Sequence, residues 1–148
     1  MRVFLFFILI IAFPSCFLFN QFRKDSFSFS ENGVQKNYTA VVPKGFSKAE
    51  KKFDSSGNEA QFYYYPDGTS LYFVKLVDTA VQYQPINYLE NQPKEIYNTI
   101  FYKRFDSVER YWRETRFDNY KLGYRSAKKG EDWKFDSAIN YFSIHLRN

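Results

Sequence analysis

The stretch QFYYYPDGTSLYFVKLV, residues Gln61 to Val77, carries the clearest fold signal in the chain. Pro66 suits the first corner of a type I turn, and Asp67 tolerates the second. Gly68 supplies the positive φ that lets the chain rejoin the ladder through a bulge. Aromatic and β-branched residues flank this turn, and both kinds favour strands. The stretch therefore predicts a β-hairpin.

Rings fall on both faces of this predicted hairpin. Side chains alternate along a strand, so Phe62 and Tyr64 share one face while Tyr63 and Tyr65 share the other. At least one of these faces must be covered by another part of the chain. A tyrosine cluster of this kind can be a stacking platform for sugars or bases, or it can be sheet core. Cross-strand ring pairs commonly stabilise sheets, which favours the core interpretation.

A second hairpin is predicted over Arg110 to Ser126, with Asp118 and Asn119 at its turn. Its arms interleave arginines with aromatic residues, a combination that holds anionic or planar ligands through charge, cation–π contacts and stacking. Amphipathic strands with one solvated face produce the same composition without any ligand. The candidate binding residues are Tyr111, Trp112, Arg113, Arg116, Tyr124 and Arg125.

The C-terminal segment is predicted to be a helix that follows Gly130. Apolar or small residues recur there at helical spacing and would form one inward-facing stripe, made of Phe135, Ala138, Ile139, Phe142 and Leu146. Asp132 can cap the amino end, where an acid also suits the helix dipole. His145 has no second histidine or cysteine nearby, so we expect a surface residue and not a ligand or base.

Three shorter segments complete the first half. Tyr38 to Val42 predicts a strand that stops at Pro43. Ser47 to Lys52 fits a short helix or an exposed loop, and Asp54 to Asn58 is a turn cluster.

A second helix is predicted over Lys94 to Phe105, because apolar residues recur there close to a helical period. A strand is the competing interpretation, since Ile100 to Phe105 also suits extended structure. Taken together, the elements predict an α+β fold. It is a twisted antiparallel sheet with the C-terminal helix on one face and the possible second helix completing an alpha-beta-alpha sandwich.

The first 16 residues, MRVFLFFILIIAFPSC, predict export. The apolar run from Val3 to Phe13 matches the core of a signal peptide and is too short to cross a hydrocarbon layer of about 30 Å. Ser15 then precedes Cys16, the only cysteine in the chain. This order resembles the bacterial lipoprotein signal. The resemblance implies lipidation at Cys16 and membrane anchoring on the extracytoplasmic side, in the periplasm or at the cell surface.

Two other interpretations of the leader stay open. Phe13 and Pro14 replace the usual residues of a lipoprotein signal, and Phe17 to Phe19 is more apolar than the usual polar tether. Val3 to Phe19 could therefore act as a short uncleaved anchor. Ordinary cleavage that leaves a structural or free cysteine is the third interpretation. All three place the domain outside the cytoplasm.

The length of 148 residues allows one modest domain after the leader. Residues 17–37 are predicted to be a tether, because Ser, Lys, Asp, Asn and Gln dominate from Asn20 to Asn37. The alternating Phe27 and Phe29 suggest that the tether ends in a strand. Residues 38–148 form the predicted globular domain.

Composition limits the function classes. The formal net charge of +5 is a mild basic excess, which allows contact with anionic surfaces but does not indicate nucleic-acid binding. The sequence has no nucleophile motif with a positioned base, no metal-ligand spacing and no Gly-rich phosphate loop. We therefore expect no catalysis, no metal and no cofactor.

The chain also contains YTAVVPKGF at Tyr38 to Phe46, the hairpin through Pro66 to Gly68, and FDSAINYF at Phe135 to Phe142. Together these stretches resemble the PsbP-like family of alpha-beta-alpha sandwiches, many of whose members are exported and lipid-anchored. The resemblance implies a role in assembling or supporting membrane-associated complexes, and the family has no common catalytic residue.

These observations favour a small exported lipoprotein, anchored in a membrane, that has a noncatalytic protein-binding or structural role at the cell envelope. The alternative is a ligand-binding module for glycans or anionic lipids, which would use the candidate residues of the second hairpin.

Overall fold

A computed structural model describes residues 20–77, 94–96, 99–104 and 110–146 of the chain. Its elements are β1 (Phe22–Glu31), β2 (Val34–Pro43), β3 (Lys48–Phe53), β4 (Glu59–Tyr64), β5 (Ser70–Lys75), β6 (Lys94–Ile96), β7 (Thr99–Arg104), β8 (Arg110–Phe117), β9 (Tyr120–Lys128) and α2 (Asp132–Leu146). The predicted α+β class is confirmed, with most of the described residues in strands.

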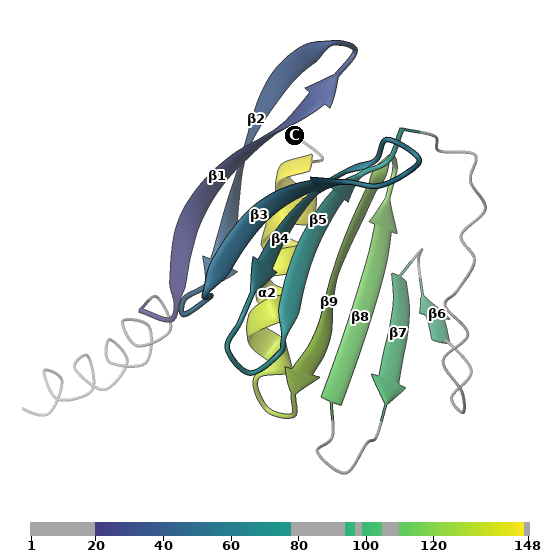
Figure 1. Cartoon of the computed structure of the whole chain (residues 1–148). Coiled ribbons are helices and arrows are strands. Elements are labelled where there is room, and N and C mark those ends of the chain that lie inside the picture. Colours follow the sequence, from purple (N-terminus) through teal and green to yellow (C-terminus); the bar gives the residue numbers. More distant parts are fainter. Residues whose placement is uncertain (1–19, 78–93, 97–98, 105–109, 147–148) are drawn as a thin grey trace, which may run out of the picture.

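Seven strands form one antiparallel main sheet in the order β3-β4-β5-β9-β8-β7-β6, while β1 and β2 pair separately as a long hairpin (Figure 1). Both predicted hairpins are confirmed. In the first, Tyr64 pairs with Ser70, and Gly68 has the expected positive φ of 87°. In the second, Phe117 pairs with Tyr120 across a two-residue turn.

The core lies between the main sheet on one side and the β1–β2 hairpin with α2 on the other. All of the predicted helix stripe faces inward: Phe135, Ala138, Ile139 and Phe142 are buried, and Leu146 packs at the margin. The hairpin contributes Phe29, Ala40 and Val42, and the sheet contributes Tyr63, Leu71, Phe73 and Leu122. We call this side of the sheet the covered face and the opposite side the outer face.

The predicted tether is wrong for its described part, because residues 22–37 are folded. Phe22 to Glu31 is a strand, and Phe29 is fully buried. Asn32 and Gly33 have positive φ values of 51° and 80°, which is the conformation of a tight hairpin turn. Polar residues dominate here because the hairpin buries only one of its faces.

The helix predicted over Lys94 to Phe105 is also wrong in its described residues, which form β6 and β7. Ile96 pairs with Thr99, and β7 continues the main sheet beside β8. Pairing with a neighbouring strand decided the structure here, and the helical spacing of the isoleucines was coincidental. Among the described residues, α2 is the helix that packs on the sheet, so the second helical layer of a sandwich is not seen in them.

Ser47 to Lys52, predicted as a short helix or loop, mostly lies in β3 at one end of the main sheet. Its lysines suit an edge strand, where charge discourages pairing with other chains. The predicted turn at Asp54 to Asn58 is confirmed, since the Asp54 carboxylate accepts the backbone N–H groups of Ser56 and Asn58.

The leader, including Cys16, lies outside the described residues. None of the helices within the described ranges has the length and apolar character needed to cross a membrane.

Candidate functional site

The six candidate binding residues of the β8–β9 hairpin do not form one surface. Strand alternation places Tyr111, Arg113 and Tyr124 on the covered face, and Trp112, Arg116 and Arg125 on the outer face. The spacing of arginines and rings along the sequence was therefore a poor guide to their proximity in space.

The covered-face members hold α2 in place. Arg113 donates to Asp136 at 2.8 Å and to Asn140 at 3.1 Å, and both acceptors lie on the helix. Tyr124 is 4% exposed and its ring contacts Phe135. Tyr111 packs at the margin of the same core. These three side chains are structural.

One outer-face member, Arg125, lies beside a buried polar pair. The hydroxyl of Tyr72 donates to Glu114 at 2.5 Å, and the two residues are only 3% and 6% exposed. Arg125 lies over the Tyr72 ring, and burial followed by the charge of Glu114 raises the pKa of Tyr72 well above its usual range. Gly123 lies directly beneath the hydroxyl, where a methyl group would collide with it. This pair is packed into the sheet and offers no open site.

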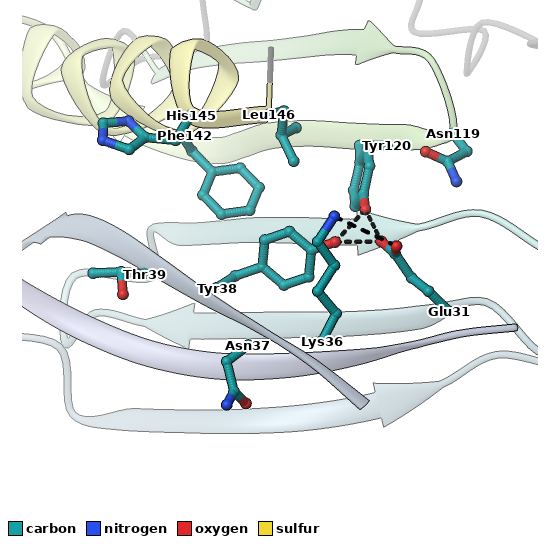
Figure 2. A pocket seen from close by; sticks show the side chains of 10 residues that line it. All are labelled: Glu31, Lys36, Asn37, Tyr38, Thr39, Asn119, Tyr120, Phe142, His145 and Leu146. Atoms are coloured by element: carbon teal, nitrogen blue, oxygen red, sulfur yellow. Dashed lines mark hydrogen bonds and ion pairs between the residues drawn. The ribbon is translucent and has the colours of Figure 1, made fainter. Parts of the chain in front are cut away.

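A pocket of about 580 Å³ lies elsewhere, at the end of the molecule where α2 stops (Figure 2). Three parts of the chain line it. Lys36 to Thr39 of β2, together with Glu31, form one wall, Asn119 and Tyr120 at the start of β9 form another, and the last turn of α2 supplies Phe142, His145 and Leu146. Sequence reasoning did not identify this site.

A glutamate with two tyrosine donors lies inside the pocket. The hydroxyls of Tyr38 and Tyr120 both donate to Glu31 Oε1 and are 2.6 Å apart, and Figure 2 shows them converging on the carboxylate. Two ammonium groups flank it: Lys36 Nζ is 3.6 Å from Oε2, and Lys75 Nζ is 3.7 Å from Oε1. We call these five residues the Glu31 cluster.

Electrostatics fixes Glu31 in its ionised form. Partial burial opposes ionisation, but the hydrogen bonds from Tyr120 and Tyr38 and the charges of Lys75 and Lys36 outweigh it and lower the pKa of Glu31 to about 2. Burial and the hydrogen bond to Glu31 raise the pKa of Tyr38 to about 12. The cluster therefore contains one negative and two positive charges at neutral pH, a net charge of +1.

Unpaired backbone groups of β2 form part of the pocket wall. Along an antiparallel strand, the backbone N–H and C=O groups of successive residues point alternately towards the partner strand and away from it. On β1, the N–H of Ser30 donates to Glu59 at 3.1 Å and the C=O of Ser28 accepts from Lys51 at 2.9 Å. The backbone groups of these two residues therefore point away from β2. Ser28 pairs with Asn37, and Ser26 pairs with Thr39. The N–H and C=O groups of Asn37 and Thr39 therefore point out of β2.

The two edges of this hairpin are treated differently. The side chains of Glu59 and Lys51 occupy two backbone groups on the edge of β1, whereas the described residues include no such partner for Asn37 and Thr39 on the outer edge of β2. At Asn37 and Thr39 this edge adjoins the pocket. The pocket therefore combines a positively charged cluster, an apolar wall from α2 and a row of free backbone donors and acceptors.

The protonation states of the cluster limit the acid–base chemistry that it can perform. The raised pKa keeps Tyr38 protonated at neutral pH, so its hydroxyl does not accept a proton, and the lowered pKa of Glu31 makes its carboxylate a weak base. His145 is exposed, as predicted, and its Nδ1 is 2.8 Å from the backbone oxygen of Tyr141. Over the described ranges, no group of histidine, cysteine or acidic side chains is placed to hold a metal ion.

One signal in the sequence could have revealed part of the site. Asn32-Gly33 between alternating residues is a strong marker of a two-residue hairpin, and it would have placed Glu31 and Lys36 on the same face. Nothing in the sequence links them to Lys75 or Tyr120, because the main sheet brings those residues together.

Comparisons with models of protein families, with curated proteins and with solved structures found no significant match. The resemblance to the PsbP-like family therefore remains an expectation from three short stretches.

Proposed function

We propose that the protein is a small exported lipoprotein, anchored in a membrane through Cys16, whose domain binds a protein partner at the cell envelope without catalysing a reaction. The leader sequence supports export and anchoring, as argued above. The observation that supports binding is the pocket, where an unpaired strand edge adjoins the Glu31 cluster.

The remaining polar groups of the domain support a noncatalytic role. Several buried ones form structural pairs, such as Tyr72 with Glu114 and Tyr63 with Asp25 at 2.8 Å. Such pairs satisfy groups that burial would otherwise leave without hydrogen bonds.

Labelling of cells with radioactive palmitate tests the anchor. We expect label in the wild-type chain and none in Cys16→Ala. Equal incorporation in both proteins, or none in either, would exclude lipidation at this residue. Photo-crosslinking from an unnatural residue in place of Asn37, with the same residue in place of Ser55 as control, tests the partner. A protein adduct that forms from position 37 alone is expected.

A second candidate function is binding of glycans or anionic lipids, which the positive charge of the pocket favours. It would use Lys36 and not the six residues of the β8–β9 hairpin, since those lie on opposite faces. Lys36→Gln should then abolish retention on an array of acidic glycans or lipids, and Arg125→Gln should leave it unchanged. The reverse result would return the site to the outer face.

A further inference from the structure

We propose that the edge of β2 at Asn37 and Thr39, together with the adjoining pocket, binds an extended acidic peptide segment of the partner by strand addition. This inference rests on the proposed function only in taking the partner to be a protein. It names the binding edge, the binding mode and the charge of the ligand.

The backbone of β2 provides the first part of the argument. Two N–H donors and two C=O acceptors, from Asn37 and Thr39, point out of the strand and have no partner among the described residues. An extended peptide satisfies such groups with its own backbone, and this interaction needs no particular side chains. Both residues are exposed, so the edge is accessible.

Two neighbouring edges, those of β1 and β3, have some protection against strand pairing. On β1, Glu59 accepts from the N–H of Ser30 and Lys51 donates to the C=O of Ser28. On β3, Lys48, Lys51 and Lys52 provide the charge that discourages strand pairing. Helix α2 packs against β2, but Asn37 and Thr39, which border the pocket, are exposed. An open strand edge beside a pocket can accept an extended segment of another protein as an additional strand.

The pocket defines which side chains the added strand should have. Inward-facing residues of that strand would lie beside Tyr38 and Lys36, next to the apolar Phe142 and Leu146. Oε1 of Glu31 already accepts from the hydroxyls of Tyr38 and Tyr120. Because the cluster has a net charge of +1, it complements one added carboxylate.

Lys36 is the group most able to reach that carboxylate. Its side chain is 60% exposed, and its Nζ is 3.6 Å from Glu31 Oε2. This is longer than the roughly 2.8 Å of a charge-assisted hydrogen bond. The ammonium group can therefore turn towards a ligand without breaking a short bond to Glu31.

The test uses the full chain, labelled with ¹⁵N and held in detergent micelles, and three peptides. These are acetyl-TVEVT-amide and its counterparts with glutamine or lysine in place of glutamate. We expect the glutamate peptide to shift the backbone amide NMR signals of Asn37 and Thr39. It should bind about fivefold more tightly than the glutamine peptide, and the lysine peptide should bind most weakly. Equal affinities would overturn the acidic preference. No shift with any peptide at about 5 mM would overturn strand addition.

Two pairs of variants locate the interaction. Thr39→Pro removes an outward N–H without removing a bond to β1 and should abolish binding, whereas Thr39→Val keeps the N–H and should bind normally. Lys36→Gln should remove the preference for glutamate over glutamine. Lys48→Gln is the matched control, because Lys48 is 62% exposed and also lies beside a glutamate. If Thr39→Pro does not fold, the lysine pair still decides the question, and equal effects of the two lysine variants would overturn the site.

A second copy of the chain is the competing occupant of the edge. In that case the signals of Asn37 and Thr39 would shift with protein concentration in the absence of peptide, and the micellar particle would contain two chains. This result would overturn the proposal. A failure of palmitate labelling at Cys16 would leave it intact, so the anchor and the peptide site are tested separately.

Discussion

The Tyr72–Glu114 pair and the Glu31 cluster both have tyrosine donating to glutamate, but they differ in almost every other respect. Tyr72 and Glu114 are packed into the outer face with 3% and 6% exposure. In the Glu31 cluster, two tyrosines share one carboxylate, two lysines flank it, and the glutamate side chain is 25% exposed. The first group is isolated by packing, whereas the second borders a pocket.

This difference separates a structural pair from a candidate site. A buried pair without spare partners loses a whole hydrogen bond when one member is removed, and water cannot replace it. A cluster with two donors and access to water tolerates the loss of either donor. A tyrosine–glutamate hydrogen bond therefore does not by itself identify a functional site. The exposure of the carboxylate and the number of its donors distinguish a candidate site from a structural pair.

The largest predicted effect concerns the packing around Tyr72. Gly123→Ala would place a methyl group against the Tyr72 hydroxyl and 2.7 Å from the backbone oxygen of Arg113, which cannot move aside. We expect a loss of about 3 kcal/mol in the free energy of unfolding, measured by urea denaturation. Gly68→Ala meets no atom within 4 Å and should cost only about 1 kcal/mol through its positive φ. Equal losses would mean that the outer-face pair is not tightly packed.

Removing the hydroxyl of the buried pair should have the next largest effect. Tyr72→Phe leaves a buried carboxylate with Lys121 Nζ at 3.9 Å, and we expect a loss of about 2 kcal/mol. Tyr64→Phe is the control on the same face, since its hydroxyl accepts from the exposed Lys52. A smaller loss for Tyr72→Phe than for Tyr64→Phe would contradict the proposed role of burial.

Acid should weaken the Glu31 cluster in a defined pH range. The pKa of Glu31 is lowered from 4.5 to about 2, so its contribution to stability is complete above pH 4.5 and is lost as the pH falls to about 2. The double variant with Tyr38→Phe and Tyr120→Phe lacks both hydroxyl donors. Between pH 7 and pH 2.5, this variant should lose roughly 1 to 2 kcal/mol less stability than the wild type. Other carboxylates titrate in both proteins, so parallel pH profiles would show that the hydroxyls do not hold Glu31 ionised.

The smallest effect is expected for a single donor of the cluster. Tyr38→Phe leaves Tyr120 bonded to Glu31 and should cost about 0.5 kcal/mol in urea denaturation at pH 7. The double variant with Tyr120→Phe should lose more than the sum of the two single losses, because only then is the carboxylate without a donor. Additive losses would show that the two hydroxyls do not substitute for each other.

Much of the fold could be predicted because its signals are local. The turn at Pro66 to Gly68, the turn at Asp118 and Asn119, and the stripe from Phe135 to Leu146 each depend on residues close in sequence. The errors arose where local signals conflicted, although β1 pairs with β2 across Asn32-Gly33 and Ile96 of β6 pairs with Thr99 of β7. β6 and β7 have apolar spacings that fit a helix, and β1 has a composition that fits a tether.

The candidate site was not predictable for a different reason. Glu31, Lys75 and Tyr120 come from three parts of the chain and meet only after the sheet has formed. The six candidate residues of the β8–β9 hairpin show the opposite case, because they are close in sequence but do not form one surface. Tyr111 and Trp112 are neighbours in sequence, yet alternation along β8 separates them onto opposite faces.

The folding of β1 also affects how far the domain can stand from a membrane. With residues 22–37 in the hairpin, the stretch between Cys16 and β1 shrinks to five residues, 17–21, which span about 17 Å at full extension. If Cys16 bears a lipid, the domain is held almost against the bilayer and cannot reach across the envelope. Its partner would then have to be a membrane protein or a neighbour at the same surface.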